Sequence, residues 1–282
     1  MTTKHKTINC SGKIIDLSEP KVMGIVNVTP DSFYSGSRCQ SENEVVERVK
    51  KHLSEGATFI DLGAYSTRPG CEDISAEEEI NRLKPALDII TKEFPQALIS
   101  IDTFRSQVAE FAISEYGVPI INDISGGMLD EKMSEIVGKY HAAYILMHMI
   151  GTPQNMQSNC NYNNLIEDIT KFFAVQSEKF RKAGTNDIIL DPGFGFSKTL
   201  DQNYELMNKM QDFEIFGLPI LVGISRKSMI YKLLGGTPAD SANGTTVLNT
   251  IALLKGADIL RVHDVKPAVE AIKICEKTIS KS

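Results

Sequence analysis

The chain has 282 residues, of which 42% are hydrophobic and 23% charged, a composition typical of globular proteins. Its 30 Lys and Arg residues against 36 Asp and Glu residues give a formal net charge of −6. This argues against a nucleic-acid partner, because a phosphate backbone needs a basic face. No apolar run approaches the roughly 20 residues of a membrane span, and the first ten residues lack the apolar core of a signal peptide. The five cysteines form no C-x-x-C pair, so we expect a cytoplasmic protein with reduced thiols and no membrane contact.

Residues 1–20 precede the repeating part of the chain. The segment 7–15 around Ser11 and Gly12 predicts a small β-hairpin. In a barrel this hairpin could cover the bottom opening.

Eight short runs of apolar and β-branched residues follow, and most are continuously apolar rather than alternating. This pattern is typical of parallel strands that are covered on both faces. The predicted strands are residues 22–26, 59–62, 98–101, 119–121, 143–147, 187–190, 220–224 and 259–262.

Helical patterns separate the strands. We expect helices over residues 41–55 (with Ser41 as a capping candidate), after an S-x-x-E capping box at Ser75 and Glu78, over 163–182, over 242–255, and from a start near Pro267. The strands recur about every 34 residues, the size of a β-α-β unit. We therefore predict one α/β domain over 1–282, a (β/α)₈ TIM barrel with a short N-terminal hairpin. A doubly wound open sheet is the alternative.

The predicted strands end in polar residues almost every time, at the face where barrels place their active sites. In chain order these residues are Asn27, Asp61, Asp102, Asn122 with Asp123, His148, Asp191, Ser225 to Lys227, and Arg261 with His263 and Asp264. A single Asp or Asn at a strand end is more often a turn former or helix cap. We interpret Asp123 and Asp264 in this way, and His148 as either a core residue or a ligand.

The signs of charge separate between the strands. Acidic and amide groups follow the third, fourth and sixth strands, whereas Lys227, Arg261 and His263 follow the seventh and eighth. Surface ion pairing is the alternative for the basic residues, but barrels often bind phosphate at these last two loops. Asp102, Asn122 and Asp191 together suit the amino and ring N–H edge of a pterin or purine. No P-loop, H-E-x-x-H or complete nucleophile-elbow motif is present.

These strand-end residues and the motifs around them resemble those of the dihydropteroate synthase family. The matching motifs cover every predicted unit in order: GIVNVTPDSF (24–33), STRPG (66–70), IDTF (101–104), INDISGG (121–127), HMIGTPQNMQ (148–157), DPGFGF (191–196), GISRKS (223–228) and RVHD (261–264). The resemblance implies condensation of 6-hydroxymethyl-7,8-dihydropterin pyrophosphate with 4-aminobenzoate in folate biosynthesis. The products would be 7,8-dihydropteroate and pyrophosphate, and sulfonamides would target the enzyme.

The resemblance also implies the site residues, position by position. It implies pterin binding by Asp102, Asn122, Asp191, Lys227 and Arg261. It implies pyrophosphate binding by Asn27, Thr67, Arg68, Arg261 and His263, with Asn27 also holding Mg²⁺. It implies a 4-aminobenzoate pocket of Thr67, Arg68, Pro69, Phe196 and Ser228, and a catalytic set of Lys227, Arg261, His263 and Asp102. A homodimer through the last helices is a further implication.

Two features of the mechanism follow as hypotheses. Pyrophosphate would leave first, its charge held by Mg²⁺, Lys, Arg and His, and the arylamine would then attack the pterin methylene. No side-chain nucleophile is needed. The chain departs from the family at GAYSTRPG, where Ala64 and Tyr65 replace the usual Gly-Glu, so any role of that Glu is in doubt.

Three other readings compete with the synthase. A pterin-binding methyltetrahydrofolate methyltransferase has a similar Asp and Asn set but no pyrophosphate to hold. A pterin carrier or inactive synthase relative would not need the intact set. An unrelated phosphate-binding barrel, such as an aldolase, would usually need a Schiff-base Lys or a metal cluster, and neither is evident.

Overall fold

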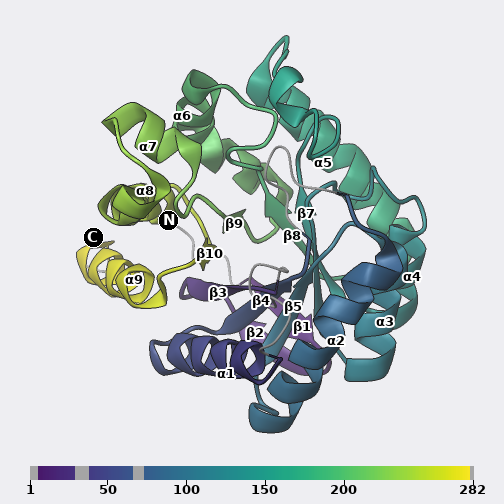
Figure 1. Ribbon diagram of the computed structural model, residues 1–282. Helices are drawn as coiled ribbons and strands as arrows, with labels where there is room; N and C mark the ends of the chain where they lie inside the picture. The colour runs from purple at the N-terminus through teal and green to yellow at the C-terminus, as the bar shows by residue number, and fades with distance from the viewer. Residues whose placement is uncertain (1–5, 29–37, 66–72, 280–282) are drawn as a thin grey trace.

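The computed structural model describes residues 6–28, 38–65 and 73–279 (Figure 1). Its first elements are the antiparallel strands β1 (Thr7–Cys10) and β2 (Lys13–Asp16). The two residues between them, Ser11 and Gly12, have positive φ values of 50° and 89°. A two-residue hairpin turn of type I′ requires such values at both positions. The predicted hairpin is thus confirmed.

Eight parallel strands form the centre of the molecule. They are β3 (Lys21–Asn27), β4 (Phe59–Gly63), β5 (Leu98–Asp102), β6 (Ile120–Asp123), β7 (Ala143–Met147), β8 (Ile188–Asp191), β9 (Leu221–Val222) and β10 (Ile259–Val262). Their order is β8-β7-β6-β5-β4-β3-β10-β9. A parallel bridge between Leu190 and Ile220 joins the two ends of this order. The sheet is therefore a closed barrel, as predicted, and the open-sheet alternative is wrong.

The seventh strand is shorter than expected. The sequence predicts residues 220–224, but β9 covers only Leu221–Val222. Gly223 and Ile224 leave the sheet before the turn at Ser225 and Arg226 that precedes the next helix. Arg226 has a left-handed φ of 57° in this turn, a conformation that ends a strand.

Helices alternate with the strands and surround them (Figure 1). They are α1 (Arg38–Ser54), α2 (Ala76–Glu93), α3 (Ser106–Tyr116), α4 (Met133–Tyr140), α5 (Leu165–Lys182), α6 (Leu200–Lys209), α7 (Ser228–Leu234), α8 (Ala242–Leu254) and α9 (Val265–Ile279). Short 3₁₀ turns are η2 (Met156–Ser158), η3 (Met210–Phe216) and η4 (Pro238–Ser241). No helix within the described ranges is long and apolar enough to cross a membrane.

The helix starts test the capping predictions. The Ser75 hydroxyl accepts the Glu78 N–H at 3.1 Å, as expected. Ser41 lies inside α1 rather than at its cap, because the helix begins three residues earlier, at Arg38. Pro267 is the third residue of α9, still within the first turn, where no helical N–H bond is lost.

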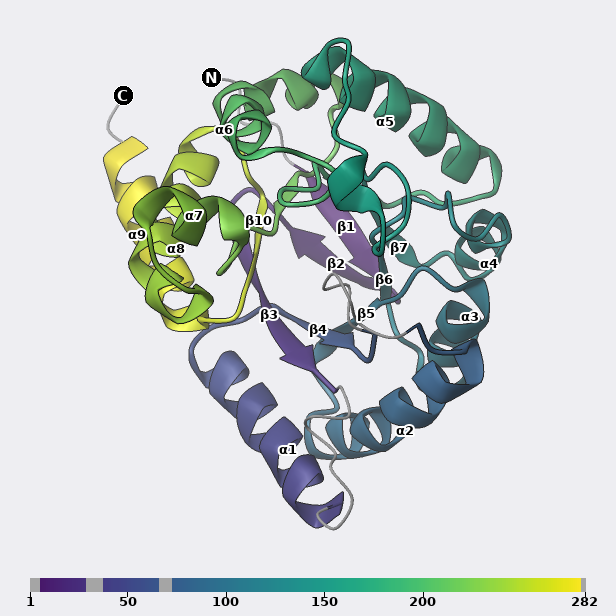
Figure 2. The same cartoon turned by 45° about the horizontal axis from the view of Figure 1, so that its top comes forward.

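The hairpin covers the lower opening of the barrel. Its buried side chains Ile8, Cys10, Ile15 and Leu17 pack with inward-facing residues of the strands, including Met23. Figure 2 shows the two short strands lying across the space that the barrel strands enclose. The Asn9 N–H donates to Asp187 Oδ1 at 3.0 Å, which ties the hairpin to the chain before β8. The hairpin thus closes the lower end of the barrel, and a substrate-binding site is expected at the opposite end.

Candidate active site

Polar side chains meet at the carboxyl ends of the barrel strands. Arg261 on β10 lies at the centre: its Nε donates to Asp61 Oδ2 on β4 at 2.6 Å, and one Nη donates to Asp102 Oδ2 on β5 at 2.6 Å. The Asn122 side-chain amide on β6 donates to the same Asp61 oxygen at 3.0 Å. Four strand ends are thereby connected by charged and amide groups.

Burial sets the protonation of this cluster. It raises the pKa of Asp102 to about 7, because a buried carboxylate loses solvation, while Arg261 opposes the shift and Asp61 adds to it. Burial also disfavours the charged form of Arg261, but the carboxylates of Asp61 and Asp102 outweigh this effect and raise its pKa. Arg261 therefore stays charged, and Asp102 changes charge near neutral pH.

A second cluster lies at the ends of β8 and β9. Asp191 is 5% exposed, and its Oδ1 accepts the Gly193 N–H at 2.8 Å. Lys227, the residue before α7, donates through Nζ to the Phe194 carbonyl, and Nζ lies 4.4 Å from the centre of the Phe196 ring. Burial lowers the pKa of Lys227 to about 8, against the opposing effect of Asp191. Burial raises the pKa of Asp191, which Lys227 in turn lowers.

The close approach of Lys227 explains one glycine of the DPGFGF motif. Gly195 has a φ of +81°, and a Cβ at this position would lie 2.9 Å from the Lys227 Cδ. A larger residue would be strained by the backbone and would displace the lysine side chain. The motif therefore serves the contact between the β8 loop and Lys227.

His263 follows β10 and faces the turn after β9. Its Nδ1 lies 3.0 Å from the Ser225 hydroxyl. Burial lowers the pKa of His263 to about 4, and Arg261 and Arg226 add to this effect. The imidazole is therefore neutral at pH 7, and its role would be that of a hydrogen-bonding group rather than a cation.

Two aspartates support the site without facing it. Asp123 is fully buried and accepts hydrogen bonds from the N–H groups of Ser125 and Gly127 and from the hydroxyls of Ser125 and Tyr144, at 2.7–2.9 Å. Asp264 forms an ion pair with Arg226 at 2.8 Å. Both agree with the interpretation of these residues as capping or supporting groups.

The structure connects to the site two residues for which the sequence predicted no binding or catalytic role, although it placed Asp61 among the polar strand ends. Asp61 marked the end of a predicted strand, and a carboxylate inside the apolar run FIDL was the available signal for its role. Lys198 gave no signal in the sequence. It is 3% exposed, and its Nζ lies 3.2 Å from His148 Nδ1. His148 is buried too, and burial together with Lys198 lowers its pKa well below the ordinary range. His148 is thus a buried partner of Lys198.

Of the other predicted site residues, some lie within the described ranges and some do not. Thr67, Arg68 and Pro69 lie outside the described residues. Asn27 is the last residue of β3 and is exposed. Ser228 is the first residue of α7 and is half-buried, on the same turn as Lys227.

Tyr65, the departure from the family pattern, contacts two strand ends. Its hydroxyl accepts the Gln154 side-chain N–H at 2.8 Å, and its ring packs edge-on against Phe104 at 5.2 Å. The Arg105 guanidinium lies 5.0 Å from the Tyr65 ring centre and pairs with buried Glu79 at 2.5 Å. Tyr65 thus connects the end of β4 to the loop after β7 by an uncharged group.

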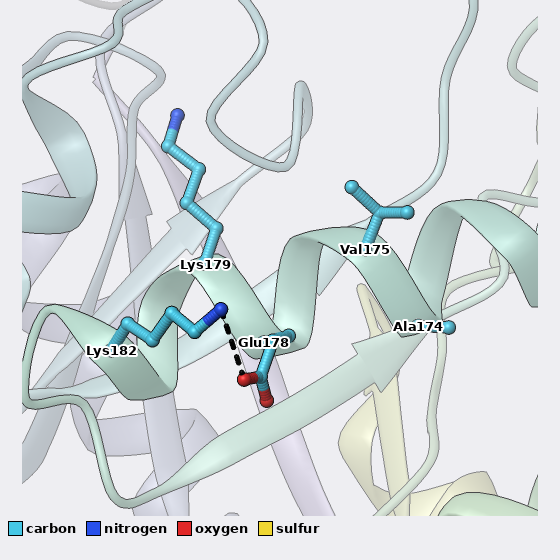
Figure 3. A pocket seen from close by; sticks show the side chains of 5 residues that line it. All are labelled: Ala174, Val175, Glu178, Lys179 and Lys182. Atoms are coloured by element: carbon cyan, nitrogen blue, oxygen red, sulfur yellow. Dashed lines mark ion pairs between the residues drawn. The ribbon is translucent and has the colours of Figure 1, made fainter.

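A shallow surface pocket lies elsewhere, on the outer face of the second half of α5 (Figure 3). It is lined by Ala174, Val175, Glu178, Lys179 and Lys182, with an exposed ion pair of 3.3 Å between Glu178 and Lys182. All five residues belong to one helix, and none comes from a strand end. We therefore place the candidate site at the strand ends.

Comparisons with known proteins identify the family of the chain. A family model described as "Pterin binding enzyme" matches residues 23–263. The dihydropteroate synthase of Escherichia coli strain K12 is 40% identical over 271 residues, covering 95% of each chain. The Yersinia pestis dihydropteroate synthase, solved with a sulfonamide drug, has a TM-score of 0.90 at 40% identity, covering 97% of this chain and 99% of that one. The Thermus thermophilus enzyme, solved with 4-aminobenzoate, has a TM-score of 0.86 at 33% identity, covering 96% and 99%.

Proposed function

The chain belongs to the dihydropteroate synthase family of pterin-binding enzymes, and we propose that it condenses dihydropterin pyrophosphate with 4-aminobenzoate. The observation that carries the proposal is the side-by-side placement of two charge clusters at the strand ends. Asp102, Asn122 and Asp191 offer acceptors and an amide, and Lys227, Arg261 and His263 stand on the adjoining β9 and β10 side.

The acidic cluster suits the pterin. The amino group and ring N–H of a pterin need acceptors, and its ring carbonyl needs a donor. Ionised Asp102 and Asp191 would accept, and the Asn122 amide can do both. Asp102 and Asp191 each have one hydrogen-bond partner among the described residues, Arg261 and the Gly193 N–H, and a ligand that donates to their remaining lone pairs would offset more of the cost of removing them from water.

The basic cluster suits the leaving group. In the proposed reaction the bond between the pterin methylene carbon and a pyrophosphate oxygen breaks, and its electron pair leaves with the pyrophosphate. The arylamine lone pair then forms the new C–N bond, and the nitrogen releases a proton to water. Arg261 and Lys227 would stabilise the negative charge that develops on the pyrophosphate, and neutral His263 would donate a hydrogen bond.

The residues fit Mg²⁺ only together with the substrate. The exposed Asn27 carboxamide offers one oxygen, and Mg²⁺ is commonly held by one or two protein oxygens plus substrate phosphates. The described part of the chain contains no group of three or more His, Cys, Asp or Glu side chains that could hold a metal ion. When bound, the ion would neutralise charge on the pyrophosphate.

The second substrate would lie beside Lys227. Phe196 and Ser228 flank this residue and would form the described part of the 4-aminobenzoate pocket, with Thr67, Arg68 and Pro69 completing it. A sulfonamide resembles 4-aminobenzoate in shape, so we expect it to compete for this pocket. The Yersinia pestis relative was solved with such a drug.

A coupling assay tests the function. Wild type, Lys227→Ala and the matched control Lys232→Ala are supplied with dihydropterin pyrophosphate, 4-aminobenzoate and Mg²⁺. Lys232 is an exposed lysine of α7, the helix that follows Lys227. We expect dihydropteroate from wild type and control, and at least a hundredfold less from Lys227→Ala, since the half-buried charge that we propose to face the leaving group is lost. Absence of product from wild type, with pterin binding intact, would instead favour a methyltransferase or an inactive synthase relative.

We also propose that the chain forms a homodimer through its last helices. Large apolar side chains are exposed on α7, α8 and α9, which pack side by side in Figures 1 and 2. They are Leu233, Leu234, Val247, Leu254 and Ile274, each 50–66% exposed. Exposed apolar side chains on neighbouring helices are a typical feature of an interaction surface.

Light scattering after size-exclusion chromatography measures the association. Leu254→Glu should shift the protein from dimer to monomer, because a charge would be buried at the interface. The control Val175→Glu changes a comparably exposed apolar residue on α5 and should leave the mass unchanged. A monomeric wild type would refute the proposal.

A further inference from the structure

Lys198 is a buried lysine without a carboxylate in hydrogen-bond or ion-pair contact among the described residues. It lies in the loop between β8 and α6, and it is 3% exposed. Its Nζ contacts neutral acceptors: the Gly193 carbonyl at 3.0 Å, the Phe196 carbonyl at 3.1 Å and His148 Nδ1 at 3.2 Å. An ammonium group has three N–H donors, so each has one partner. Burying such a group is costly unless these bonds are made, so its position needs an explanation.

The three contacts hold the loop from both sides. Two of them join carbonyls of the same loop, and the third joins the loop to the end of β7 through His148. The loop is also strained, because Ser197 has a left-handed φ of 45°. Such strain persists only where the surroundings determine the backbone. The three contacts of Lys198 help to hold the backbone in this conformation.

The held segment carries the contacts of Lys227. The Phe194 carbonyl accepts the Lys227 ammonium, and the Phe196 ring lies 4.4 Å from it. Asp191, at the start of the same loop, is fixed independently because it is part of β8, and its carbonyl accepts the His148 N–H at 3.0 Å. Lys198 therefore controls Phe196 more than it controls Asp191.

We propose that Lys198 is a positioning residue for the aromatic-acid side of the site, holding Phe196 and the Phe194 carbonyl at a fixed spacing from Lys227. The inference rests on the proposed function. It assigns to Lys198 the task of fixing the 4-aminobenzoate pocket at a set distance from the pterin-binding residues. The buried environment agrees with it: burial lowers the pKa of Lys198 to about 7, opposed by Asp191 and reinforced by Lys227.

Loss of Lys198 should therefore change the KM for 4-aminobenzoate more than the KM for the pterin substrate. Removing the ammonium frees the Phe196 and Gly193 carbonyls and His148 Nδ1, but it leaves Asp191 in its strand. The KM for 4-aminobenzoate should rise about tenfold, the lower end of what losing hydrogen bonds to a charged group predicts. The KM for the pterin substrate should change less than about threefold, because the strand bonds of Asp191 remain.

Steady-state kinetics with both substrates varied provide the test. Lys198→Met keeps the length of the side chain and removes its charge, and Lys198→Arg keeps the charge and donors. The control Lys209→Met removes an exposed lysine from α6, the next helix. We expect the separation of KM values in Lys198→Met, partial recovery in Lys198→Arg and wild-type values in the control.

The other outcomes are distinct. Equal changes in both KM values, or a lower Tm with unchanged KM values, would overturn the positioning role. If Lys198→Met does not fold, Lys198→Gln takes its place with two N–H donors, and failure of both to fold would assign Lys198 to the fold alone. A wild type that makes no dihydropteroate would refute the proposed function, and this inference would fall with it.

Discussion

Replacing Asp61 by Asn tests whether the buried carboxylate organises the site. Asp61 is fully buried, and one of its oxygens accepts both Arg261 Nε at 2.6 Å and the Asn122 amide at 3.0 Å. Removing one partner of a buried ion pair costs about 3–5 kcal/mol. Arg261 keeps Asp102, and the new amide oxygen can still accept, so we expect a loss of about 2 kcal/mol, or about 30-fold in the unfolding constant.

Urea denaturation at one protein concentration measures that loss, and steady-state kinetics measure its effect on the site. We expect kcat/KM to fall at least tenfold, since the acceptor that Arg261 and Asn122 share at position 61 loses its charge. Ser100→Ala is the matched control: Ser100 is the strand neighbour of Asp61, buried, and its hydroxyl has no partner within the described ranges. If Asp61→Asn matches this control in stability and in kcat/KM, the organising role of Asp61 is refuted.

Two further predictions concern pH and the hairpin. The kcat/KM should rise with pH through about 7, where Asp102 ionises, and fall above about 8, where Lys227 loses its proton; a flat profile from pH 6 to 9 would contradict both roles. Burial raises the pKa of Asp102, so between about pH 4 and pH 7 the folded state keeps a proton that the unfolded chain releases. The contribution of this group to the free energy of unfolding should therefore fall as the pH rises through this range, which denaturation curves would measure. Ile8→Ala, at a residue 1% exposed, should cost about 2–4 kcal/mol without changing either KM, whereas Ile14→Ala, at a residue 63% exposed, should cost little; altered KM values would mean that the hairpin acts on the site.

The sequence predicted the architecture because the signals for it are local. Each strand is an apolar run, and its length and spacing need no knowledge of its neighbours. The errors lie where tertiary contacts decide the boundary. The strand predicted over 220–224 ends at Val222, and the helix predicted from Ser41 begins at Arg38.

The sequence named candidate residues for the site but could not give the contacts between them. That Arg261 contacts Asp61 and Asp102 depends on which strand ends face each other in the closed barrel, which a linear pattern does not encode. Lys198 folds back onto its own loop, and Tyr65 meets Gln154 from 89 residues away. Nothing in the spacing of these residues indicates such contacts.

The closure of the barrel is uneven, and this has a consequence for ligands. β3 and β4 pair through five residues, whereas β8 meets the β9 side through a single bridge between Leu190 and Ile220. Asp191 and Lys227 stand just beyond this seam, one on each side. A ligand bound by both residues would therefore bridge the two strands that are held together by the fewest backbone contacts. Its binding free energy would then stabilise the closed barrel against local opening between β8 and β9, so ligand binding and barrel closure would be thermodynamically coupled.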